Sequence, residues 1–380
     1  MNRTKLFLIG YFSPSWIASL LMWGDDRTSA DFISAPPWFF AFRQVVQILS
    51  ILILFVPPRP RDNPSFFGLF FAVATLVALY FTNPILEAEN ILISSSIQIA
   101  IIAAFLSIFK PSVELVASDF ALLFFLFLGG FAIQIFLYFQ FDVIPSHTIK
   151  DVFIRFNGIT NDSLTTAFVL SVLIPWAATG RRRALKAPAL IGMAFATGSM
   201  FAVAFVPVTT IAYLLYKKSN KAAFISISCL LSAGLYFYDL LAGLFAVKLD
   251  SIITHLSFFL DLSGGSLYKS VSCSEEFCES FVEAGFHLSR VYVVAFYAML
   301  AFFILPLWQA RQAGLRPAMS ADAIRLYGVA LLTGSLVHPV PLIPLAVPLF
   351  LVLASLHSNG PGGFYAPATP IRGYTRPVAS

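Results

Sequence analysis

The sequence predicts an all-α, polytopic integral membrane protein with about twelve transmembrane helices and one large external loop. Of its 380 residues, 58% are hydrophobic and only 11% are charged, and the mean hydropathy is +0.84. A soluble protein of this composition could not cover its own surface with polar side chains. Apolar runs of about 17–25 residues recur along the chain, and each can cross a bilayer core of about 30 Å. Helices satisfy the backbone hydrogen bonds of such runs inside lipid.

Ten apolar runs are interpreted as single spans, and the expected total lies between ten and twelve. The first run lacks a small-residue cleavage site of the A-x-A kind, so we expect a retained helix there and not a signal peptide. The ten runs are residues 5–23, 38–56, 65–82, 91–109, 119–140, 160–178, 222–241, 289–309, 321–337 and 340–356.

Residues 187–216 form an apolar segment of about 30 residues, which is too long for one untilted span. A single crossing would place "RRRALK" (181–186) and "KKSNK" (217–221) on opposite sides of the membrane. Lys and Arg favour the cytoplasmic side, so two crossings that turn at Thr197, Gly198 and Ser199 fit better. The sequence therefore predicts a helical hairpin here and twelve spans in total.

This topology puts both termini in the cytoplasm and concentrates the basic residues there. Sixteen Lys and Arg residues fall in inner segments, and Arg43 and Arg325 fall within spans. Residues 1–358 are expected to form one transmembrane domain, and 359–380, rich in Gly, Pro and Ser, a disordered cytoplasmic tail. The net charge of +5 fits this inner excess and calls for no nucleic-acid partner. Six basic residues fall in outer segments: Arg27, Lys150, Arg155, Lys248, Lys269 and Arg290.

The largest external loop, residues 242–288, contains apolar residues at helical spacing from Leu249 to Leu260, which is typical of an amphipathic helix. Loops of this length are usually functional or disordered. Cys273 and Cys278 lie in it and either form a disulfide or remain two free thiols. No metal site is expected, because no paired C-x-x-C exists and His255 and His287 are far from the cysteines.

The stretch "RFNGITNDS" (155–163) places polar residues directly before the sixth span, at its outer end. Asn157 and Gly158 predict a turn, and Thr160, Asn161 and Asp162 are candidate helix caps. A helix N-terminus together with Arg155 would suit a phosphate group. The alternative is an ordinary cap, with Arg155 reaching the lipid headgroups.

Arg43 lies within the second span, near the outer leaflet, and is interpreted either as a functional residue or as an arginine that extends outward to the headgroups. The other spans contain few charges, which argues against an ion-coupled transporter. The external histidines are each either a general base or a bystander, and the external carboxylates either functional or a solvated loop face. The histidines are His147, His255, His287 and His338, and the carboxylates Asp250, Glu275, Glu276, Glu279 and Glu283.

The chain resembles the O-antigen polymerase/ligase family of bacterial inner-membrane proteins, over roughly residues 90–356. "RFNGITNDS" is similar to the family's R-x-x-G motif before a mid-chain helix, and "ATGSMFAVAFVP" is similar to its T-x-S-R turn. "SGGS" followed by "FVEAGF" resembles the G-x-G and E-x-G of the family's external loop. The closing cytoplasmic loop and the pair of short helices after it complete the likeness. The chain departs at Met200, where many members have arginine, and Lys248 is the nearest match to an arginine at the start of the loop.

The resemblance implies a glycosyltransferase that joins polyprenyl-pyrophosphate-linked repeat units at the periplasmic face of the inner membrane, without a metal, nucleotide sugar or other cofactor. Such a reaction needs cations for the pyrophosphate and a base for the acceptor hydroxyl. The base candidates are His338 and Glu283, which flank predicted helix ends, followed by His287 and His255. The binding candidates are Arg155, Asn157, Asn161, Arg43, Lys248 and Arg290.

Three other functions remain open. An O-antigen ligase would transfer the glycan to a lipid A core and shares the same physical requirements. A flippase for lipid-linked oligosaccharides also fits twelve spans but would need more cations within its helices, and a non-catalytic partner of an envelope assembly machine is the third. The expected partners are the lipid-linked oligosaccharide and membrane lipid, with a chain-length regulator and a flippase as candidate protein partners.

Overall fold

The computed structural model describes residues 2–21, 37–61, 69–70, 72–73, 87–113, 115–141, 148–149, 153–154, 156–160, 163–236, 298, 319–334 and 346–358. Helices dominate these ranges. They are α1 (Arg3–Leu21), α2 (Pro37–Ile53), α4 (Glu87–Ile108), α5 (Ala117–Phe141), α6 (Ser163–Ala177), α7 (Arg183–Ala196), α8 (Met200–Tyr216), α9 (Asn220–Tyr236), α13 (Met319–Gly334) and α14 (Ala346–Ser358).

Two short antiparallel ribbons accompany the helices and were not expected from the sequence. β1 (Arg59–Pro60) pairs with β2 (Phe109–Lys110), and β3 (Thr148–Ile149) pairs with β4 (Phe153–Ile154). Each strand has only two residues, so no hydrophobic alternation marks it in the sequence. The ribbons connect segments outside the helices, and the described part of the chain is otherwise helical.

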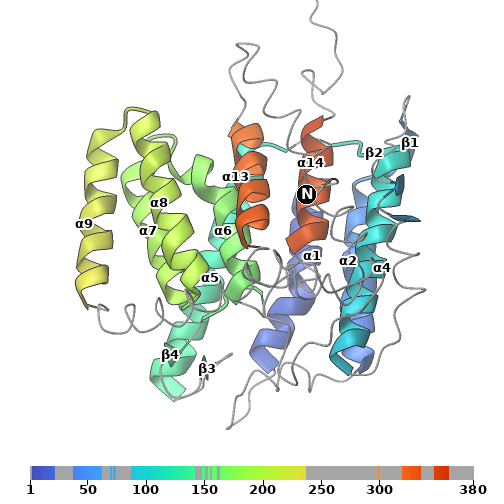
Figure 1. The fold of residues 1–380 in the computed structure, drawn as a ribbon, viewed down its shortest axis with the longest axis horizontal. Coiled ribbons are helices and arrows are strands. Elements are labelled where there is room, and N and C mark those ends of the chain that lie inside the picture. The colour runs from blue at the N-terminus through green and yellow to red at the C-terminus, as the bar shows by residue number, and fades with distance from the viewer. Residues whose placement is uncertain are drawn as a thin grey trace, which may run out of the picture.

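The helices stand side by side in a bundle, with α9 at one edge and α2 and α4 at the other (Figure 1). α6 lies in the interior: every residue from Ser163 to Ala177 is buried except Trp176. A methyl group at Gly334 of α13 would lie 2.4 Å from the Phe168 ring, so the absence of a side chain lets α13 approach α6 closely. α8 is tied to α13 by Asp322, which accepts hydrogen bonds from the Tyr213 hydroxyl at 2.7 Å and from Arg325 at 3.0 Å.

The surface of the bundle carries many large apolar side chains, as lipid contact would require. Phe139 on α5 is 79% exposed, and Leu235 on α9 is 78% exposed. Among the described helices, α5 with its 25 residues is the one both long and apolar enough to cross a membrane by itself. The shorter apolar helices include α6, α8 and parts of α2, α4, α9 and α14. The twelve-span topology therefore stays a prediction.

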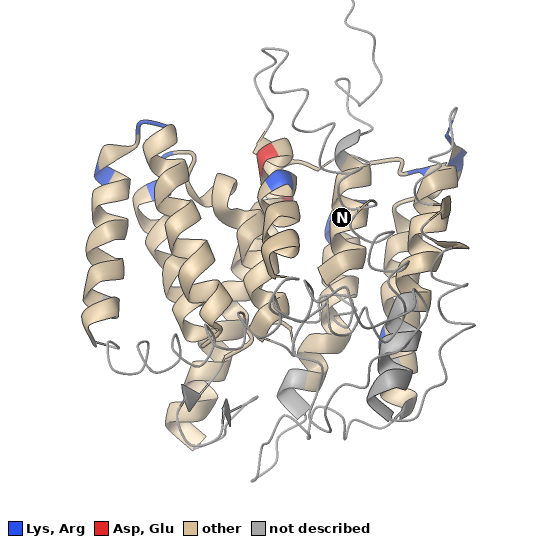
Figure 2. Ribbon diagram, viewed as in Figure 1, with Lys and Arg blue, Asp and Glu red and all other residues tan. Residues whose placement is uncertain are grey.

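The predicted hairpin within 187–216 is present as α7, a short turn and α8. Thr197, Gly198 and Ser199 form the turn, and Gly198 has a φ of +58°, which glycine adopts at little cost. The basic residues before α7 and after α8 lie at the same end of the bundle (Figure 2). Lys186 of α7 packs over the Trp176 ring and donates to the Trp176 and Thr179 carbonyl oxygens at 2.6 and 2.8 Å.

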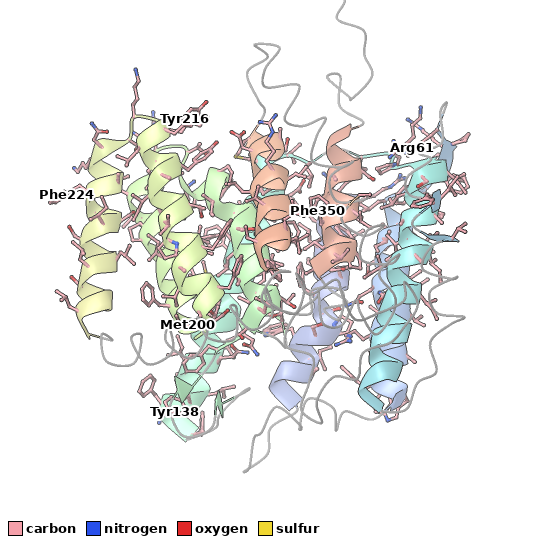
Figure 3. The ribbon with its side chains drawn as sticks, viewed as in Figure 1. Arg61, Tyr138, Met200, Tyr216, Phe224 and Phe350 are labelled. Carbon is pink, nitrogen blue, oxygen red and sulfur yellow. The ribbon has the colours of Figure 1, made fainter. Side chains whose placement is uncertain are left out.

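Most described Lys and Arg side chains gather toward this end, called here the basic end, which also holds β1 and β2 (Figure 2). Arg61 donates from Nε to the carbonyl oxygens of Leu106, at 2.8 Å, and of Phe109, at 3.2 Å, where α4 ends. Burial lowers the pKa of Arg61 below its usual value. The opposite end holds the α7–α8 turn and the end of α5. In Figure 3, Met200 and Tyr138 lie toward this end, and Arg61 and Tyr216 lie at the basic end.

Candidate functional site

The segment before α6, residues 156–160, is called the pre-α6 loop and lies at the end of the bundle away from the basic end. The Phe156 backbone N–H donates to the Ala196 carbonyl oxygen at 2.9 Å, next to the α7–α8 turn. The Thr197 side chain helps to hold that turn: its hydroxyl donates to the Ala194 carbonyl and accepts from the Ser199 N–H. The polar segment "RFNGITNDS" and the "ATGSM" turn, separate in sequence, therefore meet in the fold.

Two glycines let the pre-α6 loop pack tightly against α5. Gly158 has a φ of +63°, in the left-handed region that favours glycine. A methyl group at Gly130 of α5 would lie 2.8 Å from the Gly158 carbonyl carbon, closer than real contacts allow. The turn predicted at Asn157-Gly158 is thus present, and Gly130 provides the space for it.

Threonine hydroxyls fix the Asn157 backbone. The Asn157 carbonyl oxygen accepts from the Thr166 hydroxyl at 2.6 Å and from the Thr160 hydroxyl at 3.2 Å, and the two hydroxyl oxygens lie 2.5 Å apart. Thr160 was a candidate cap, but α6 begins at Ser163, and the Thr160 side chain bonds within the turn. The first residue of α6 thus directly follows the three predicted cap candidates, of which Asn161 and Asp162 lie outside the described residues.

The Asn157 side chain is 0% exposed, and neither its amide oxygen nor its amide nitrogen has a hydrogen-bond partner within the described structure. Gln134 of α5, also 0% exposed, accepts from the Gly158 N–H at 2.8 Å with Oε1, while its Nε2 has no partner there. Leaving a buried polar group unpaired costs about 1–3 kcal/mol. Three such atoms lie on two side chains that are linked through the Gly158 backbone: Gln134 bonds to its N–H, and Asn157 is the residue before it.

Sequence reasoning selected Asn157 and missed Gln134. Gln134 stands in the apolar stretch "GGFAIQIFLYF", where a lone amide in a long span could have indicated an internal polar contact. Its partner is a backbone N–H far along the chain, and that pairing leaves no pattern in the sequence.

Arg43 on α2 is only 2% exposed, so its side chain lies within the bundle. α2 packs against α1, which carries the fully buried Tyr11. One turn further along α2, Gln47 accepts from Gln98 of α4 at 3.1 Å. Arg43 thus belongs to a polar stripe on the α1–α2 side of the bundle, whereas Asn157 contacts α5 and α6.

The other predicted site residues lie outside the described residues. These are His338, Glu283, His287, His255, Arg155, Asn161, Lys248 and Arg290, together with the disulfide candidates Cys273 and Cys278. Within the described ranges no cluster of three His, Cys, Asp or Glu side chains could hold a metal ion, and Cys229 is a free, exposed thiol. Met200, at the position of the family's arginine, begins α8.

Comparisons of the chain with protein-family models, with curated proteins and with solved structures give no match. The likeness to the O-antigen polymerase/ligase family therefore depends on the order and spacing of the motifs given above.

Proposed function

We propose that this chain is a glycosyltransferase of the bacterial inner membrane that polymerises polyprenyl-pyrophosphate-linked repeat units at the periplasmic face. One observation supports this function best. The pre-α6 loop and the α7–α8 turn, the two helix-flanking segments that resemble family motifs, are joined by the hydrogen bond from Phe156 to Ala196. They lie away from the basic end, which the positive-inside rule assigns to the cytoplasm.

In the proposed reaction a hydroxyl oxygen of the acceptor glycan attacks the anomeric carbon of the donor. The bond from that carbon to the pyrophosphate breaks, and the lipid pyrophosphate leaves with the bonding electrons. A base takes the hydroxyl proton, with His338 and Glu283 as the first candidates and His287 and His255 as the next.

The leaving pyrophosphate gains negative charge in the transition state and needs donors that are already in position. Arg155 immediately precedes the pre-α6 loop, and the N-terminus of α6, the positive end of its helix dipole, is close in sequence. Asn161, Lys248 and Arg290 are further binding candidates. Arg43 is retained as a candidate, but as a buried residue on α2 it would act from the α1–α2 side of the bundle.

The test of this function compares Arg155→Ala with Arg59→Ala in a null strain of the natural host, and resolves the cell's polysaccharide by size. Arg59 is exposed in β1 at the basic end, so Arg59→Ala is the control that also removes one arginine. We expect Arg59→Ala to restore long chains and Arg155→Ala to leave single repeat units that are exported and attached. Protein levels in the membrane are measured for both variants.

Two other results would contradict the polymerase. Loss of all attached glycan, with polymer accumulating on its lipid carrier, would identify a ligase instead. Long chains at normal protein levels in Arg155→Ala would mean that Arg155 is an interfacial arginine without a role in the reaction.

A further inference from the structure

The unpaired atoms of the buried Gln134 and Asn157 amides can be identified as donors or acceptors, because a hydrogen bond fixes the orientation of the Gln134 amide. The Gly158 N–H is a donor, so the Gln134 atom 2.8 Å from it must be the amide oxygen. The Gln134 NH₂ group is therefore the end that is left without a partner. Asn157, the residue before Gly158, leaves both its oxygen and its NH₂ group unpaired.

The two amides are linked through the Gly158 backbone, and between them they offer two NH₂ donors and one acceptor oxygen, with no charge. Neither carries a charge, so this pair does not supply the cations that a pyrophosphate requires. An arrangement of amide donors and an acceptor complements neutral groups that both donate and accept, such as the hydroxyl and acetamido groups of a sugar.

The surroundings of the pair also suit a sugar. Tyr138 lies one helical turn after Gln134 on α5, and Phe156 directly precedes Asn157. Their rings, both half-buried, are 6.0 Å apart and provide an aromatic surface for the apolar face of a sugar ring. The Asn157 backbone is held by Thr160 and Thr166, so the amide is supported before any ligand binds.

We propose that Gln134 and Asn157 bind the sugar next to the pyrophosphate, and so determine which lipid-linked glycan the protein accepts. This inference rests on the proposed function. The unpaired atoms are closed to solvent in this structure, so the sugar binds by displacing the side chains that cover them. Sugar hydroxyl or acetamido groups then take up the free donors and the free acceptor.

The test measures binding of two probes to the purified, full-length protein in detergent. One probe is undecaprenyl pyrophosphate without a glycan, and the other is the lipid-linked repeat unit extracted from a host strain that lacks this chain. The variants are Gln134→Leu and Asn157→Leu, with Gln98→Leu as the control. Gln98 is a buried amide of α4 that bonds to Gln47 on the other side of the bundle. Thermal unfolding in detergent checks that each variant is folded.

We expect the wild-type protein to prefer the lipid-linked repeat unit over the bare carrier. Gln134→Leu and Asn157→Leu should each weaken binding of the repeat unit by about tenfold, as the loss of buried hydrogen bonds implies, and leave the bare carrier within about twofold. Gln98→Leu should bind both probes as the wild type does.

Retention of the wild-type preference in both site variants would overturn the sugar site and leave the proposed function standing. Equal weakening of both probes would also overturn it, because the amides would then act on the pyrophosphate or on the fold. A wild-type protein without any preference for the glycan-bearing lipid would overturn the inference and the proposed function together.

Discussion

At the scale of single residues, Asn157 combines a strongly fixed backbone with an unsatisfied side chain. Its carbonyl oxygen accepts two threonine hydroxyls, yet its amide, fully buried, pairs with nothing within the described structure. A residue selected for stability alone would be apolar here, because an unpaired amide costs free energy and a leucine of similar size does not. Unsatisfied groups of this kind are expected at functional sites.

We predict that Asn157→Leu raises the free energy of unfolding, by about 1–3 kcal/mol for each unpaired group removed, while polymer formation is lost. Thr166→Val is the matched variant at the same site, since it removes the donor to the Asn157 carbonyl and should destabilise by about 1 kcal/mol. Thermal unfolding in detergent and polysaccharide length in cells measure the two effects. An Asn157→Leu protein that is less stable than the wild type would show that the amide is a structural group.

The sequence indicated part of this site for a physical reason and missed part for another. Asn157-Gly158 is a local turn signal, and the turn is present. Gln134 contributes through a hydrogen bond across 24 residues, which no local pattern encodes. For Arg43 the sequence left two interpretations open, and its burial in the bundle could not be predicted from the sequence.

At the scale of elements, the position of the pre-α6 loop depends on how closely α5 approaches it. Gly129 and Gly130 are neighbours on α5, but only a side chain at Gly130 would meet the loop; at Gly129 nothing lies within 4 Å. Alanine at either position changes the helix propensity of α5, but only alanine at Gly130 also disturbs the packing of the loop. Comparing the two variants therefore separates these effects.

Gly130→Ala should lower the free energy of unfolding by about 1–3 kcal/mol and shorten the polysaccharide, because the loop must move away from α5. Gly129→Ala should leave chain length unchanged and stabilise α5 by about 0.5–1 kcal/mol, the usual gain of alanine over glycine in a helix. Unfolding and polysaccharide length are measured for both. Equal behaviour of the two variants would contradict this packing.

Within the described ranges, long apolar runs of the sequence form helices, whereas the short strands were not predicted. The hairpin of α7 and α8 turns at Thr197–Ser199 as predicted. The prediction was possible because only a turn within 187–216 places the basic residues before α7 and after α8 at the same end. α6 begins directly after the predicted cap candidates, and of these Thr160 bonds within its own turn. The four two-residue strands form through contacts between distant segments, which the sequence pattern does not reveal.

At the scale of the whole molecule, the two ends of the bundle differ in chemistry. One end carries most of the described Lys and Arg residues, and the other carries the pre-α6 loop with its hydroxyl and amide groups (Figures 2 and 3). In a membrane protein such an asymmetry orients the chain, because basic segments remain in the cytoplasm. The candidate site would then face outward.

This orientation predicts the accessibility of single cysteines in a background in which the chain's three native cysteines are serine. Arg182→Cys and Lys218→Cys should react with a membrane-impermeant maleimide only from the cytoplasmic side. Ser146→Cys, in the segment between α5 and α6, should react only from the outer side. Labelling of positions 182 and 218 from opposite sides would contradict both the orientation and the hairpin.

Reconstitution in liposomes is the most direct test of the proposal that this chain joins lipid-linked repeat units. The purified protein is placed in liposomes with the lipid-linked repeat unit as the only substrate, and the glycan is resolved by length over time. We expect chains of increasing length, with one lipid pyrophosphate released for every unit joined, and none of this in Arg155→Ala. Repeat units that stay single on their lipid in the presence of folded wild-type protein would contradict the claim.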